Sequence, residues 1–244
     1  MSKNKTILII GAKSDIALAV AHKFASEGYS LQLAARNSSE LYEIVSDLKI
    51  RYEIKVTVYE LDILKNEIFA DWVNSLDSLP DIAFCAVGIL GNQEDDEKNV
   101  FNSALVMRTN YEGPALLLSE IANLFEKRGS GSIIGISSVA GDRGRASNYI
   151  YGSSKSAFTA FLSGLRNRLH ISNINVITIL PGFVNTKMTS HLALPIGITS
   201  TSKKIASLVY KSKSKSKIIY VFPWRFIMML ILFIPESIFK KLKI

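Results

Sequence analysis

The chain has 244 residues, of which 48% are hydrophobic and 20% charged, with 14 glycines and 6 prolines. This length suits one domain, and the composition excludes disordered, collagen-like and low-complexity chains. A single cysteine excludes an internal disulfide and a cysteine-rich zinc site. The three histidines lie far apart in sequence, so we predict no metal site.

The net charge of +8 is concentrated near the end of the chain. Residues 200–244 hold ten basic residues and one acid, a charge of +9, which leaves −1 for the rest. A nucleic-acid-binding protein usually spreads its basic residues over a face of the fold, so we expect no nucleic-acid partner. Because the charge adjoins the most apolar segment, it points instead to an anionic membrane surface.

Apolar, β-branched runs alternate with segments of helical periodicity along the chain. We expect strands at 5–10, 30–35, 54–61, 81–87, 132–136, 175–180 and 217–222. We expect helices at 15–27, 38–49, 65–76, 100–127, 151–169 and 202–209. This alternation predicts an α/β fold of Rossmann type, a doubly wound parallel sheet with helices on both faces. Ligands bind such folds at the carboxyl ends of the strands.

The organisation that we expect is one domain over residues 1–200, with its sheet completed by 201–222. A short hydrophobic and basic extension follows at 223–244. The first strand begins without a signal-peptide pattern, so we expect a cytoplasmic protein.

A glycine turn follows the first strand and enters a helix. It reads Gly11, Ala12, Lys13, Ser14, Asp15, Ile16, Ala17. The N–H groups of such a helix N-terminus suit a pyrophosphate. Asp15 and Ala17 stand where the usual fingerprint has glycines, so a purely structural join is an equal alternative.

The second strand is followed by Arg36 rather than by the acid that usually holds the ribose of NAD. Arg36 suits a 2′-phosphate, with Lys13 as a second positive charge. This favours NADP(H), with NAD(H) as the alternative; a solvated surface arginine is the other interpretation. Asp62 and Ile63 follow the third strand, where Asp62 could face an adenine or cap the next helix.

The strongest chemical signal lies between residues 132 and 155. Ser138 ends a strand, and Tyr151 and Lys155 are four residues apart on one face of a helix. A phenol has an ordinary pKa near 10, and a neighbouring ammonium lowers it by stabilising the phenolate. A serine hydroxyl can hold a carbonyl oxygen while the phenol transfers a proton.

These motifs resemble those of the short-chain dehydrogenase/reductase family over roughly residues 5–190. The resemblance implies a catalytic set of Asn110, Ser138, Tyr151 and Lys155. Tyr151 would be the acid/base, Lys155 would hold the cofactor's ribose, Ser138 would orient the carbonyl, and Asn110 would fix a water. The resemblance also places the cofactor against Gly88 and against Pro181, Gly182, Val184 and Thr186. Cys85 and Ala86 depart from the family pattern, and Cys85 is predicted to be a small buried hydrophobe.

A narrower resemblance concerns one branch of that family, the decaprenylphosphoryl-2-keto-ribose (erythro-pentofuranosid-2-ulose) 2-reductases. It rests on the stretches 14–17, 88–93, 181–189 and 221–225 and on Pro235. It implies a keto-sugar on a polyprenyl phosphate as substrate, in cell-envelope glycan synthesis, and a partner oxidase. The alternatives are a reductase of another hydrophobic ketone, sterol-like or acyl, and a cofactor-binding protein without turnover.

Residues 226–234 form an uninterrupted apolar run of nine residues, too short to cross a bilayer. Lysines flank it on both sides, which is typical of an interfacial anchor. We therefore expect a protein peripheral to the inner face of a membrane. The alternative is a C-terminal helix packed on the body or on another subunit.

Two further segments have two interpretations each. Apolar residues Phe158, Phe161, Leu162 and Leu165 of the helix at 151–169 could form the face of a homodimer or homotetramer, or belong to the core. The charged segment 93–98 could border the substrate cleft or be solvated.

Overall fold

The computed structural model describes residues 5–242 and contains a seven-stranded sheet with all strands parallel. In the order β3-β2-β1-β4-β5-β6-β9 the strands are β3 (Val56–Glu60), β2 (Ser30–Ala35), β1 (Thr6–Ile10), β4 (Ile82–Cys85), β5 (Gly131–Ile136), β6 (Ile174–Leu180) and β9 (Ile218–Tyr220). A second, two-stranded parallel ladder joins β7 (Val184–Asn185) to β8 (Ser200–Thr201).

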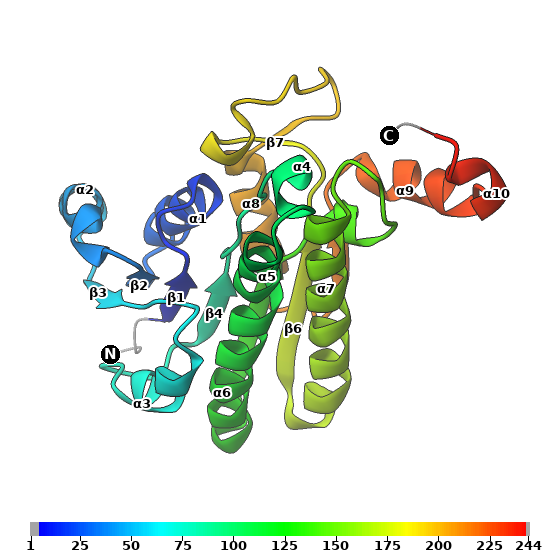
Figure 1. Ribbon diagram of the computed structural model, residues 1–244. Coiled ribbons are helices and arrows are strands. Elements are labelled where there is room, and N and C mark those ends of the chain that lie inside the picture. Colours follow the sequence, from blue (N-terminus) through cyan, green and yellow to red (C-terminus); the bar gives the residue numbers. More distant parts are fainter. Residues whose placement is uncertain (1–4, 243–244) are drawn as a thin grey trace.

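Helices connect successive strands and cover both faces of the sheet (Figure 1). They are α1 (Asp15–Ala25), α2 (Tyr42–Tyr52), α3 (Phe69–Asn74), α4 (Gln93–Asp96), α5 (Val100–Met107), α6 (Gly113–Arg128), α7 (Tyr149–Leu169), α8 (Ser202–Ser212), α9 (Trp224–Phe233) and α10 (Glu236–Phe239). The predicted doubly wound α/β fold is confirmed.

The two faces of the sheet build two apolar layers. In β1, Ile7 and Ile9 pack against α1, α2 and α8, whereas Leu8 and Ile10 pack against α3, α6 and α7. Successive strand residues point to opposite faces, so a strand buried on both sides must be apolar throughout. This requirement explains the continuous apolar runs of the sequence.

The order of strands reverses between β1 and β4, which places a switch point at the carboxyl ends of these two strands. Gly11 follows β1 there with a positive φ of 81°. A side chain on Gly11 would contact Val87 and the main chain of Ala86, which follow β4. Glycine is therefore required at this close approach.

The prediction of one continuous helix at 100–127 is wrong, because this stretch forms two helices joined by a π-helical turn over Arg108–Glu112. Pro114 lies in the first turn of α6 and has no N–H with which to continue a regular α-helix through this point. Likewise, the helix expected to begin at Tyr151 begins two residues earlier, at Tyr149.

The apolar residues of α7 belong mainly to the core. Phe158, Leu162 and Leu165 are buried, and Phe161 packs against the same cluster while partly exposed. Gly135 of β5 leaves the room that Phe158 and Leu162 fill. The core interpretation of this helix is therefore correct for the three buried side chains.

The C-terminal apolar run forms α9, which lies beyond the edge strand β9. Within residues 5–242, we find no helix with both the length and the apolar character needed to cross a bilayer.

We predict that glycine-to-alanine substitutions at two helix positions change the free energy of unfolding in opposite directions. Gly113→Ala should lower the free energy of unfolding by about 1–3 kcal/mol, because the added methyl group would overlap the carbonyl oxygen of Ile63. Gly164→Ala in α7 meets no atom within 4 Å and should raise it by up to about 1 kcal/mol through helix propensity. Urea unfolding measures both, and equal effects would contradict the packing described for Gly113.

Candidate active site

Three elements bring the predicted catalytic side chains together. Ser138 follows β5, Asn110 lies in the π-turn before α6, and Tyr151 and Lys155 occupy the first two turns of α7. Lys155, Asn110 and Ser138 are buried, and Tyr151 is partly exposed. All four lie at the carboxyl edge of the sheet, where this fold binds ligands.

The ammonium of Lys155 is held by main-chain carbonyls. Its Nζ donates to the carbonyl oxygen of Ile136 at 3.3 Å and to that of Val87 at 3.5 Å. Burial disfavours the charged form and lowers the pKa of Lys155 to about 8. A buried cation is thus aimed at the point where β4 and β5 end.

The phenol of Tyr151 interacts with the hydroxyl of Ser138. Burial raises the pKa of Tyr151, and the interaction with Ser138 opposes part of that rise. The sequence led us to expect a pKa lowered by Lys155, and this is not observed. Desolvation has the largest effect on the pKa of Tyr151, and Lys155, whose Nζ lies 5.9 Å from the centre of the Tyr151 ring, does not lower it.

Asn110 fixes the loop that follows β4. Its Oδ1 accepts from the N–H of Ile89 at 3.0 Å, and its Nδ2 donates to the Ile89 carbonyl at 2.8 Å. Gly88 lies directly between the catalytic groups, since a Cβ there would fall 2.6 Å from Asn110 Oδ1 and 3.1 Å from Lys155 Nζ. The surviving glycine of this motif therefore leaves room for the catalytic set.

The turn after β1 fits a dinucleotide pyrophosphate. Ser14 caps α1 by accepting from the N–H of Ala17 at 3.2 Å. Among the residues described, nothing accepts from the N–H groups of Asp15 and Ile16, which open the helix. Such groups and the helix dipole attract an anion.

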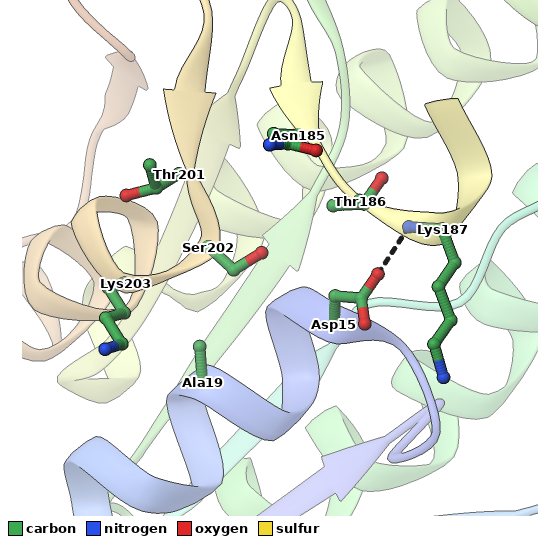
Figure 2. Close-up of a pocket in the computed structure, with 8 residues that line it drawn as sticks. All are labelled: Asp15, Ala19, Asn185, Thr186, Lys187, Thr201, Ser202 and Lys203. Carbon is green, nitrogen blue, oxygen red and sulfur yellow. Dashed lines mark hydrogen bonds between the residues drawn. The ribbon is translucent and has the colours of Figure 1, made fainter. Parts of the chain in front are cut away.

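The carboxylate of Asp15 is used elsewhere. Its Oδ2 accepts from the backbone N–H of Lys187 at 2.6 Å, so that α1 is tied to the segment after β7 (Figure 2). These two residues border a surface hollow that Thr186 also lines. Thr186 caps the short 3-10 turn Lys187–Thr189 in a reciprocal contact with Thr189. An acid in place of the expected glycine is thus satisfied by the main chain.

The predicted cationic pair meets at the loop after β2, which contains Arg36 and which Lys13 reaches from the turn after β1. Arg36 is exposed, and Lys13 donates to the Arg36 carbonyl at 3.2 Å while pairing with Glu40 at 2.6 Å. Glu60, at the end of β3, accepts from the N–H groups of Asn37 and Ser38 at 2.8 and 2.7 Å. Glu60 was not among the predicted site residues, although its place at the end of the neighbouring strand was the available signal.

The remaining predicted cofactor residues surround this edge of the sheet. Asp62 closes its own loop by accepting from Leu64 N–H at 3.0 Å, and Ile63 is buried against Gly113. Beyond β6, Pro181 and Val184 are buried, and Gly182 lies against the Trp224 ring. Asp62 therefore closes a turn and does not cap the next helical segment, whose N-cap is Lys65; its contact with an adenine stays a prediction.

Ser137 is a supporting residue that the sequence analysis did not assign. Its Oγ donates to the Lys155 carbonyl at 2.9 Å and pairs with the Thr159 hydroxyl at 2.7 Å, which anchors α7 to the end of β5.

The charged segment 93–98 contains α4, whose Gln93 side chain accepts from the N–H of Ile150 at 3.2 Å. It therefore borders the start of α7 beside the predicted catalytic residues.

Cys85 is a buried hydrophobe as predicted, and burial raises the pKa of its thiol to about 11.

We predict that the affinity for NADPH, the cofactor expected from the sequence, falls as pH rises through about 8. Lys155 carries its charge below its pKa of about 8 and loses it above, together with its hold on the ribose. Fluorescence titration measures the dissociation constant against pH. Tyr151→Phe should keep this dependence, whereas Lys155→Met should bind more weakly at all pH values and without the inflection. Loss of the inflection in Tyr151→Phe would contradict the assignment to Lys155.

Relatives of the chain include oxidoreductases. An uncharacterized oxidoreductase of Mycobacterium tuberculosis is 31% identical over 221 residues, covering 89% of this chain and 88% of the relative. An NADP-dependent 3-hydroxy acid dehydrogenase of Schizosaccharomyces pombe is 29% identical, covering 75% and 73% of the two chains.

Solved structures share the fold at lower identity. A short-chain dehydrogenase from Sphingobium yanoikuyae in complex with NADPH superposes with a TM-score of 0.81 at 19% identity, covering 96% of this chain and 97% of that one. A 3-oxoacyl-[acyl-carrier protein] reductase from Brucella melitensis in complex with NAD gives 0.80 at 19% identity, covering 90% and 96%.

The family model for short chain dehydrogenases matches residues 5–195, which contain every strand of the seven-stranded sheet except β9, the glycine turn and the four predicted catalytic side chains. The chain is therefore a member of the short-chain dehydrogenase/reductase family, an oxidoreductase that acts on CH–OH or C=O groups with NAD(P).

Proposed function

We propose that the protein is an NADPH-dependent reductase of a ketone, and that the ketone belongs to a sugar carried on a polyprenyl phosphate. One observation carries the reductase assignment: a phenol with a raised pKa faces a serine hydroxyl beside a buried ammonium. A protonated phenol is the form needed to give a proton to a carbonyl oxygen.

Each predicted catalytic residue has its own role in the proposed reduction. The bound nicotinamide supplies the hydride that goes to the carbonyl carbon. Ser138 holds the carbonyl oxygen, and Tyr151 donates its phenolic proton to that oxygen, which yields the alcohol. The phenolate left on Tyr151 is stabilised by its hydrogen bond with Ser138 and regains its proton from solvent, and Lys155 would hold the ribose of the cofactor. Asn110 keeps the loop after β4 in place through both of its bonds to Ile89.

The preference for NADPH is supported by the charges after β2. The guanidinium of Arg36 is exposed, and Lys13 lies against the same loop. The acids nearby are already engaged, Glu40 by Lys13 and Glu60 by two backbone N–H groups. Arginine suits a phosphate because it presents several N–H donors in one plane.

The substrate class rests on the narrower resemblance and on the apolar surroundings of the site. Val139, directly after Ser138, packs with Leu180, Trp224 and Met228. These buried side chains connect the residue after Ser138 to α9, whose exposed side chains Phe226, Leu230 and Phe233 would meet a carrier lipid. A free, water-soluble sugar has no need of such a surface.

Arg36→Ala should lower kcat/KM for NADPH by roughly 10- to 100-fold, because charge-assisted hydrogen bonds to the 2′-phosphate contribute about 1.5–3 kcal/mol. The value for NADH should change much less, since NADH lacks that phosphate. Steady-state kinetics with both cofactors measure the ratio. Arg51→Ala, an exposed arginine of α2, is the matched control and should leave the ratio unchanged. Equal losses with NADPH and NADH would contradict the assignment.

Tyr151→Phe should abolish NADPH oxidation, by on the order of 100-fold or more, while leaving NADPH binding at neutral pH largely intact. The assay uses the lipid and aqueous extracts of the source cell separately, and we expect wild-type turnover with the lipid extract alone. Mild acid, which cleaves glycosyl phosphates, should remove that activity.

Each other outcome excludes part of the proposal. Turnover that survives mild acid indicates a sterol-like or acyl ketone. Turnover with the aqueous extract alone contradicts the lipid carrier. Cofactor binding without turnover on any carbonyl indicates a binding protein.

A further inference from the structure

Helix α9 is apolar on two opposite sides. Trp224 and Met228 are buried, and Ile227 and Ile231 pack beside them, so this stripe faces the body. Phe226, Met229, Leu230 and Phe233 recur at the spacing of the other stripe and are exposed, Phe233 by 80%. We call this outer stripe, together with exposed Phe222 and Ile238, the outer apolar face. One stripe is used by the fold, and the other has no partner among the residues described.

Arg143 fastens this segment to the catalytic side of the molecule. Its guanidinium donates to the carbonyl oxygens of Ile231 and Ile234 at 2.5 and 2.7 Å and pairs with Glu236 at 3.0 Å. It also lies 3.6 Å from the centre of the Phe239 ring. The outer apolar face is therefore presented on a fixed support.

The charged residues of the C-terminal segment around the outer apolar face are mainly basic. Arg225 opens α9, Lys240 and Lys241 follow α10, and Lys215 and Lys217 precede β9; all five are exposed. Glu236, the one acid after residue 200, is already paired with Arg143. The charges that residues 200–242 contribute to this border are thus positive, apart from Glu236, which pairs with Arg143.

The face lies near the catalytic edge of the sheet. Trp224 contacts Gly182 after β6 and packs with Val139, the neighbour of Ser138. Figure 1 shows α9 and α10 projecting sideways from the edge strands, on the side away from α2. A surface that binds α9 would therefore lie beside the active site.

We propose that the outer apolar face and its basic border dock on the surface of an anionic lipid bilayer. The apolar side chains would enter the boundary between headgroups and acyl chains, and the lysines would contact anionic headgroups. A second copy of the chain fits less well, because a symmetric contact of this face with itself would bring like charges together. This proposal goes beyond the proposed reaction and does not depend on it.

Flotation of the full chain with vesicles tests the docking. We expect binding to phosphatidylglycerol–phosphatidylcholine vesicles, weakened by salt, and roughly tenfold or more weaker binding to phosphatidylcholine alone. Leu230→Glu/Phe233→Glu should reduce the bound fraction at least about tenfold. The matched control is Ile50→Glu/Ile171→Glu, at exposed positions distant from α9, where Ile50 is 80% exposed. The control should bind like the wild type.

A second pair of variants tests the charge without touching the apolar residues. Lys240→Glu/Lys241→Glu should weaken binding by roughly tenfold or more, whereas Lys49→Glu/Lys127→Glu, an equal change on α2 and α6, should not. If both pairs weaken binding equally, the effect is one of net charge and the proposal fails.

A wild type that floats with neither vesicle would overturn the proposal. If, in that case, the mass measured by light scattering is lower for Leu230→Glu/Phe233→Glu than for the wild type, the face belongs to self-association. NADPH oxidation with a water-soluble ketone, measured on the same variants, separates failure of docking from failure of the proposed reaction.

Discussion

The active site depends on holding one ammonium group inside the protein. Lys155 loses its hydration when α7 packs on the sheet, and two main-chain carbonyls at the ends of β4 and β5 replace part of it. These partners exist only because the two parallel strands end side by side. Ser137 then fixes α7 at this height by bonding to the Lys155 carbonyl, and Gly88 leaves the space that the ammonium fills.

The carboxyl edge of the sheet also accommodates Asp15 and Ala17 at the two positions of the turn where glycines were expected. Asp15 directs its carboxylate onto the backbone N–H of Lys187, so this acid has a hydrogen-bond partner in the segment after β7. Ala17 is fully buried, and its methyl group is part of the core under α1. Of the three glycine positions, the structure strictly requires Gly11, where the chain has a positive φ and lies against the loop after β4.

The C-terminal segment is part of the catalytic half of the molecule rather than an appendage. Arg143, five residues after Ser138, satisfies the last carbonyls of α9 and pairs with Glu236. The ring of Trp224 packs against Gly182, which follows β6. The segment that would touch a bilayer and the loop that would hold a substrate are thus linked through a few side chains. A lipid-carried substrate is chemically consistent with such a link.

The sequence by itself determined the fold class, because strands buried on both faces must be apolar throughout and helices must repeat at their own period. It also indicated Ser138, Tyr151 and Lys155, because their chemistry depends on types and spacing along single elements. The tertiary structure decided what depends on distant neighbours: the bonds of Asn110 to Ile89, the engagement of Glu60, and the pKa of Tyr151. Burial has the largest effect on the pKa of that phenol, and burial is a property of the packed chain that no local pattern encodes. The π-turn before α6 was the exception, since Pro114 was a visible signal for it.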